Sequence, residues 1–122
     1  MTFLSLIAAL ALQSNAQLPA QPEYRIEPQF PPRVAEAGLA ARCRVDARVG
    51  EQGLLVDIVP QCATSRRSRG RTDYVGMLER VSQRAVERWT FNERHIGEET
   101  STCFTFQVMG GDPLSAIEDA PC

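Results

Sequence analysis

The sequence contains no lysine, only one histidine, and no two cysteines spaced as a Cys-x-x-Cys pair. Its 13 basic residues are therefore all arginine. With 15 acidic residues the net charge is −2, which excludes the broad basic field of a dedicated nucleic-acid binder. Cysteine and histidine spacings typical of zinc sites are missing, so we expect no metal and no cofactor. With so few histidine and cysteine side chains available for catalysis or metal binding, the composition indicates a binding protein and not an enzyme.

No apolar run is long enough to span a membrane. Residues 3–12 would cover about 15 Å as a helix, half of a bilayer core. They have the length of the apolar centre of a secretory signal, and Ser14 and Ala16 place small residues before a cut at Gln17. We expect residues 1–16 to be a signal peptide of an exported protein without a transmembrane anchor. The alternative is a frayed N-terminal helix of a cytosolic protein.

The four cysteines favour an oxidising compartment. Cys43, Cys62, Cys103 and Cys122 are an even number in a short chain, which is typical of a disulfide framework. Two disulfides are expected, and four cysteines allow three pairings.

The chain has 122 residues, 43% of them hydrophobic, which allows one folded domain. Residues 17–32 hold five prolines and are expected to form an extended leader, either disordered or lying against the domain. A short helix is expected over residues 33–37, ended by Gly38.

Residues 42–49 alternate between apolar and charged, which predicts an antiparallel strand with one wet face. The wet face carries Arg42, Arg44 and Arg48, which we interpret as solvated or as a contact for an acidic partner. Residues 50–53 are expected to form a hairpin loop. The returning strand, residues 54–60, is expected to turn three side chains inward: Leu54, Val56 and Ile58.

A polar loop over residues 62–73 precedes a helix expected from Tyr74 to Arg88, with Asp73 as its N-cap. An apolar stripe along the helix predicts burial against a sheet. Residues 102–108 predict a third strand, and residues 110–122 form a cysteine-bearing tail. The expected fold class is α+β, in the order β-β-α-β: a three-stranded antiparallel sheet with one helix packed on one face. We expect this domain to span residues 33–109.

Together these residues resemble the C-terminal domain of the TonB energy transducers, over about residues 28–109. The resemblance rests on Pro28-x-Phe30-Pro31, on Ala37-Gly38, on Cys43-x-Val45-x-Ala47-x-Val49 with Gly53, on the helix Leu78-Glu79-Arg80-Val81-Ser82-x-x-Ala85-Val86-x-x-Trp89-x-Phe91, and on Gly97 with Phe104-x-Phe106. The helix that ends in Trp-x-Phe is the most specific part.

The resemblance implies a soluble periplasmic domain that acts by protein contact, without chemistry. In that family an extended peptide of an outer-membrane transporter adds as a strand to the sheet edge. The corresponding edge residues here would be Thr102, Phe104, Thr105, Phe106 and Val108. The partner is expected to be such a peptide or another envelope protein, and the oligomeric state stays open.

A rival function rests on the loop that carries Arg66, Arg67, Arg69 and Arg71. Four guanidinium groups in six residues are able to hold phosphate or carboxylate. The loop is therefore either a solvated insertion or a contact for an envelope glycan, peptidoglycan or lipopolysaccharide. A third hypothesis, a small secreted enzyme, has little support. His95 lies in a charged loop without a free nucleophile, and the adjacent Glu98 and Glu99 are expected to project apart.

Side-chain parity and the resemblance together assign the disulfides. Cys43 shares the inward face of its strand, and continuing the second strand by twos brings Cys62 to the same face, with a small bulge expected at Pro60. Related sequences carry cysteines at these two places. Cys43–Cys62 is therefore expected, and Cys103–Cys122 follows by elimination unless Cys122 pairs with another chain. The second bond would draw Leu114 and Ile117 over the outer face or the free edge of the sheet.

Overall fold

The computed structural model describes residues 20–67 and 70–122, so the expected signal peptide lies outside the described residues. Three strands, β1 (Ala41–Val49), β2 (Leu55–Thr64) and β3 (Glu99–Phe106), form one antiparallel sheet in the order β2-β1-β3. The main helix α3 (Tyr74–Val86) lies between β2 and β3 in the chain. A short helix α2 (Pro32–Glu36) precedes the sheet, and single 3-10 turns lie at Glu93–His95 and Leu114–Ala116. The expected β-β-α-β fold is confirmed.

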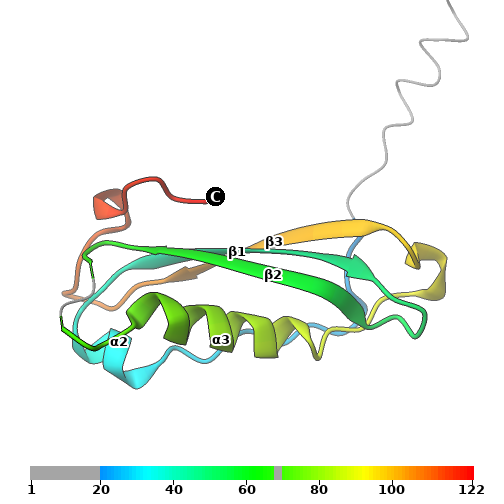
Figure 1. The fold of residues 1–122 in the computed structure, drawn as a ribbon, viewed down its shortest axis with the longest axis horizontal. Coiled ribbons are helices and arrows are strands. Elements are labelled where there is room, and N and C mark those ends of the chain that lie inside the picture. Colours follow the sequence, from blue (N-terminus) through cyan, green and yellow to red (C-terminus); the bar gives the residue numbers. More distant parts are fainter. Residues whose placement is uncertain (1–19, 68–69) are drawn as a thin grey trace, which may run out of the picture.

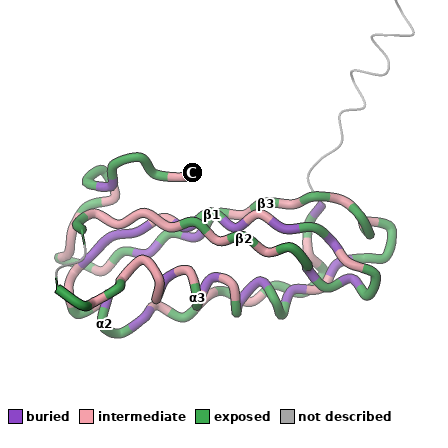
Figure 2. Tube along the Cα trace, in the orientation of Figure 1, coloured by how far each residue is buried: buried purple, intermediate pink, exposed green. Residues whose placement is uncertain are grey.

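The molecule has three layers (Figure 1). The sheet is the middle layer, α3 and the N-terminal leader cover one face, and the C-terminal tail lies on the other face. Buried residues concentrate between the sheet and α3 (Figure 2). The largest fully buried side chains there include Leu39, Leu78, Val34, Val45 and Val49.

Helix α3 begins where the sequence predicts. The Asp73 carboxylate accepts a hydrogen bond of 2.9 Å from the amide of Gly76, which satisfies one of the free amides at the helix start. The helix ends at Val86, two residues before the expected end, and Glu87 and Arg88 continue it as a tight turn. That turn delivers Trp89 to the core with 2% of its surface exposed.

The inward face of β2 differs from the prediction. Leu55 is buried, whereas Leu54 and Val56 are each 40% exposed. A bulge at Asp57, whose φ is +53°, inserts an extra residue opposite Ala47 and reverses the parity of the strand. Beyond it Ile58 packs against the core and Cys62 lies directly opposite Cys43. The predicted bulge at Pro60 is therefore at Asp57 instead.

Both disulfides have the expected pairing, Cys43–Cys62 and Cys103–Cys122. The Cα atoms of the first pair are 4.1 Å apart and those of the second 6.3 Å. β3 begins three residues earlier than expected and ends at Phe106, so Val108 lies beyond it.

None of the helices in the described part of the chain combines the length and the hydropathy needed to cross a bilayer.

Candidate functional site

The sheet has two outer strands, and β2 is poorly suited to accept another strand. The Cys62 amide points away from β1 and donates to the Glu79 carboxylate at 3.3 Å. Hydrogen-bonding direction alternates along a strand, so Pro60 and Thr64 face the same way as Cys62. Pro60 has no N–H to donate. Two of the donors that an added strand would need are therefore missing or already occupied.

The outer edge of β3 has no such protection. Val49 exchanges hydrogen bonds with Glu98 and Gly97, at 2.9 and 2.8 Å, which shows that Val49 turns its polar groups toward β3. By the same alternation, the main-chain N–H and C=O of Cys43 point toward Phe104, its partner on β3. The main-chain groups of Phe104 in turn point toward β1. The residues between, Ser101, Cys103 and Thr105, therefore direct their main-chain groups to the open edge. No other segment of the described chain forms backbone hydrogen bonds with that edge.

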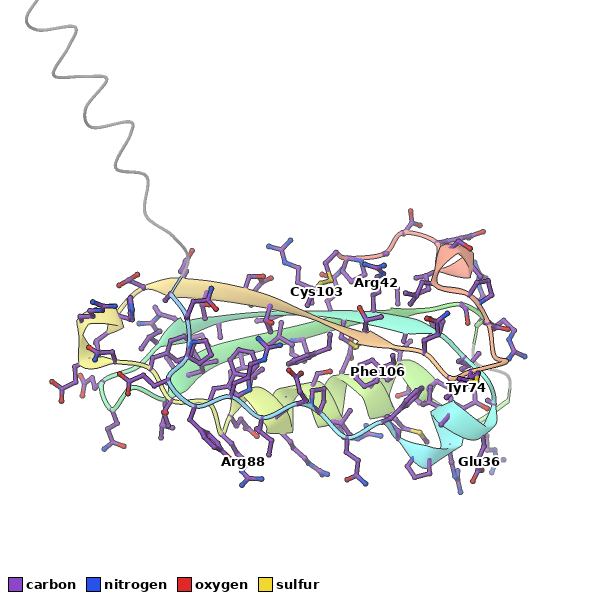
Figure 3. The ribbon with its side chains drawn as sticks, turned by 180° about the vertical axis from the view of Figure 1, so that it is seen from behind. Glu36, Arg42, Tyr74, Arg88, Cys103 and Phe106 are labelled. Atoms are coloured by element: carbon purple, nitrogen blue, oxygen red, sulfur yellow. A yellow bond between two sulfur atoms is a disulfide. The ribbon has the colours of Figure 1, made fainter. Side chains whose placement is uncertain are left out.

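A groove of about 480 Å³ runs along this edge. One wall is β3, and the other is the leader, which contributes Glu27, Pro28 and Phe30. The Phe30 ring meets the Phe106 ring edge to face, with their centroids 5.3 Å apart. Figure 3 looks onto this side of the sheet, with Cys103 above β3 and Phe106 below it.

Trp89 fixes the leader in place. Its indole N–H donates to the carbonyl of Ile26 at 2.8 Å, and the guanidinium of Arg25 lies 4.5 Å from the ring centroid. The leader is held further by backbone hydrogen bonds of Glu23 and Tyr24 with Thr90, at 2.8 to 3.4 Å. Residues 20–32 of the leader therefore lie against the domain, which is one of the two states expected for the leader.

The sequence-predicted edge residues divide into two groups. Thr105 presents its main chain to the open edge as expected. Thr102, Phe104 and Phe106 turn their main chains toward β1, and the two phenylalanine side chains are buried. Sequence reasoning missed Ser101 and Cys103, which the alternation of the strand would identify once its pairing with β1 is known.

The tail covers one end of the outer face of the sheet and leaves the edge of β3 open (Figure 1). Figure 1 shows it on the face opposite α3. The Cys103–Cys122 bond holds its end, Arg42 donates to the Cys122 carbonyl at 3.3 Å, and Ile117 is 9% exposed. Leu114 is half-buried.

One residue of the arginine loop, Arg66, is bonded to this tail. Arg66 donates to the Asp112 carboxylate at 2.7 Å and also to the Ala37 carbonyl. The Ser65 hydroxyl and then Arg66 hold the pKa of Asp112 below its usual value by bonding its ionised form. Arg67 and Arg71 are exposed, and Arg69 lies outside the described residues.

The remaining polar candidates occupy separate places. His95 contacts Glu98 at 2.9 Å within a turn, while Glu99 lies in β3 opposite Arg48. On the outer face, Arg44 pairs with Asp46 at 3.0 Å and Arg48 pairs with Asp57. Trp89 and Phe91 are core residues. Over residues 20–67 and 70–122 no group of three or more potential metal ligands occurs.

No family model matches the chain, and no curated protein matches it in sequence. A solved structure, described as the TonB2 protein from Vibrio anguillarum, has a similar fold. The two share 20% sequence identity with a TM-score of 0.50, and the match covers 78% of this chain and 87% of that one. The likeness shows a TonB-like fold.

Proposed function

We propose that the protein is a non-catalytic, periplasmic protein-interaction module that binds an extended peptide of an outer-membrane transporter by strand addition to β3. The observation that supports this most directly is the difference between the two sheet edges. β3 offers main-chain groups at Ser101, Cys103 and Thr105 beside a groove, whereas Pro60 and Glu79 obstruct β2. The two disulfides agree with export, and the TonB-like fold agrees with the compartment.

The added strand would gain affinity from main-chain hydrogen bonds and selectivity from side-chain contacts. Side chains of a strand alternate, so every second residue of the peptide would point down into the groove between β3 and the leader. There it would meet the proline ring of Pro28 and the rings of Phe30 and Phe106. A peptide with apolar residues at alternate positions fits this groove.

The test is the variant Thr105→Pro, because proline removes the outward N–H without removing a hydrogen bond to β1. Binding of short synthetic peptides, taken from the periplasmic segments of outer-membrane transporters of the same genome, is measured by titration calorimetry. We expect Thr105→Pro to weaken binding about tenfold, the equivalent of one main-chain hydrogen bond and a steric conflict. The matched variant Thr105→Val keeps the N–H and is expected to bind within about twofold of the parent.

Thr64→Pro is the control on the other edge, because its amide faces away from β1 on β2. It is expected to leave peptide affinity unchanged. Equal weakening by Thr64→Pro and Thr105→Pro would contradict the assignment to β3. If no transporter peptide binds, and muropeptides bind in a manner that Arg67→Ala/Arg71→Ala abolishes, the glycan function replaces this one.

A further inference from the structure

A second groove lies on the underside of the molecule, between the leader and α3. It consists of two adjoining hollows of about 230 Å³ each, which share Gln29, Val81 and Arg84. The floor is apolar. Helix α3 contributes Met77, Val81 and Ala85, and the leader contributes three further residues: Ile26, Pro28 and Pro31.

Three arginines form the helix side of this groove. Arg80 and Arg84 lie four residues apart on α3, beside the row Met77, Val81 and Ala85, and Arg88 follows four residues later in the turn that continues the helix. All three are exposed, and none has an ion pair or hydrogen bond with any part of the chain that the structure describes. Arg88 points away from the sheet in Figure 3.

Nearby carboxylates do not neutralise these arginines. Glu79 is turned to the Cys62 amide on β2, and Glu27, which lines the second hollow, is paired with Arg25 at 2.8 Å. Glu87 lies on the helix beside the arginine row but neither lines the groove nor forms an ion pair. The groove therefore combines an apolar floor with three uncompensated positive charges.

The spacing of the charges identifies the shape of a partner. Four residues of an α-helix rise about 6 Å, and two residues of an extended strand rise about 6.6 Å. Carboxylates at every second residue of an extended peptide would therefore meet successive arginines. The intervening side chains would point to the other face of the peptide.

We propose that this groove binds an extended acidic segment of a protein partner, with carboxylates at alternate positions, through Arg80, Arg84 and Arg88. The concave shape suits a single chain better than a flat anionic membrane, since the apolar side chains line the two hollows. Pro28, Pro31 and Pro32 leave the leader wall without N–H donors at those positions, which disfavours strand addition along this stretch. Recognition here is by side chains, independently of β3.

The probe is a fluorescent heptapeptide of alternating aspartate and valine, compared with an isomer whose aspartates are contiguous. Binding is followed by fluorescence anisotropy at low and at physiological salt. We expect the alternating peptide to bind more tightly than its isomer, and we expect salt to weaken both. Arg80→Glu/Arg84→Glu is expected to lower affinity for the alternating peptide at least about tenfold.

Arg67→Glu/Arg71→Glu changes the net charge equally and is the matched control, with an expected change below about twofold. The variant Arg80→Glu/Arg84→Glu should in turn prefer a peptide of alternating lysine and valine. Thr105→Pro should leave this binding unchanged, which separates it from the proposed function at β3. Equal loss in both arginine pairs, equal affinity for the two isomers, or binding only to phosphatidylglycerol vesicles would overturn the proposal.

Discussion

Trp89 connects the leader, the helix and the sheet through one side chain. Its indole N–H bonds the Ile26 carbonyl, and its ring meets the Phe104 ring edge to face at 5.9 Å. Buried indole rings usually need such an acceptor, because an unpaired N–H in the core is costly. The leader therefore provides the polar partner that α3 and the sheet do not.

Trp89→Ala is expected to lower the free energy of unfolding by about 3–5 kcal/mol, as large aromatic truncations do. Urea unfolding followed by far-ultraviolet circular dichroism measures it, because the only tryptophan is removed. Ile96→Ala, at a side chain that is 42% exposed, is the comparison and is expected to change stability by less than about 0.5 kcal/mol. Similar stability of the two variants would contradict the structural role of Trp89.

Asp112 gives stability a pH dependence of known sign. Its folded pKa lies below the ordinary value of 3.8, because Ser65 and Arg66 bond the carboxylate. A depressed pKa contributes stability above the unfolded value, and that contribution is lost as pH falls through the folded pKa. The parent should thus exceed Asp112→Asn in thermal midpoint at pH 6, and the difference should shrink below about pH 3.8. A difference that stays constant from pH 6 to pH 2 would show that the carboxylate charge is irrelevant.

At the scale of elements, periodicity predicted β1 and the start of α3 correctly and failed on β2. Leu54 and Leu55 are adjacent where β2 begins, and alternation alone does not decide which of them faces the core. Asp57 decides it, because its left-handed backbone switches the strand from one face to the other. Nothing in a pattern of apolar residues signals such a switch, although aspartate tolerates that conformation better than most residues.

Asp57 therefore offers a test of the bulge. Asp57→Val places a β-branched residue at positive φ and is expected to cost about 1–2 kcal/mol of stability. Asp57→Gly should retain the register at a smaller cost. Arg48→Ala removes the same ion pair without a change in backbone, so it isolates the backbone effect. Urea denaturation of the three variants ranks them, and an Arg48→Ala loss as large as that of Asp57→Val would contradict a backbone cause.

The candidate site was predictable only in part. The family resemblance pointed to the third strand, but which amides face the open edge depends on pairing with β1, a tertiary fact. The arginine row of α3 was visible as the polar side of an amphipathic helix. The position of the leader beside this row was not predictable, because it depends on tertiary contacts such as those of Ile26 with Trp89 and of Phe30 with Phe106.

At the scale of the whole molecule, two disulfides close loops of equal length: one joins β1 to β2 within the sheet, and the other joins β3 to the tail. Each joins cysteines 19 positions apart, so their effects on the unfolded chain are matched, at about 3 kcal/mol each in the chain-entropy description. Their environments differ. Cys43 is fully buried between the sheet and α3, whereas Cys103 and Cys122 are exposed on the outer face.

Mild reduction should therefore open Cys103–Cys122 first. We expect alkylation by iodoacetamide, mapped by peptide mass, to label Cys103 and Cys122 at reductant concentrations that leave Cys43 and Cys62 linked. Hydrogen exchange of the partly reduced protein should rise in residues 110–122 and stay unchanged in β1. Simultaneous labelling of all four cysteines would show that the tail does not open on its own.

The docked leader also has a consequence for the order in which the protein folds. Its anchor, Trp89, lies 63 positions after Ile26, so a chain made from its N-terminus has no anchor for the leader until most of the domain has emerged. During that interval the exposed segment is protected by its own composition. Pro22, Pro28, Pro31 and Pro32 deprive it of N–H donors at four positions and disfavour its capture by a stray sheet edge. The prolines that keep the leader extended also keep it unpaired until its partner exists.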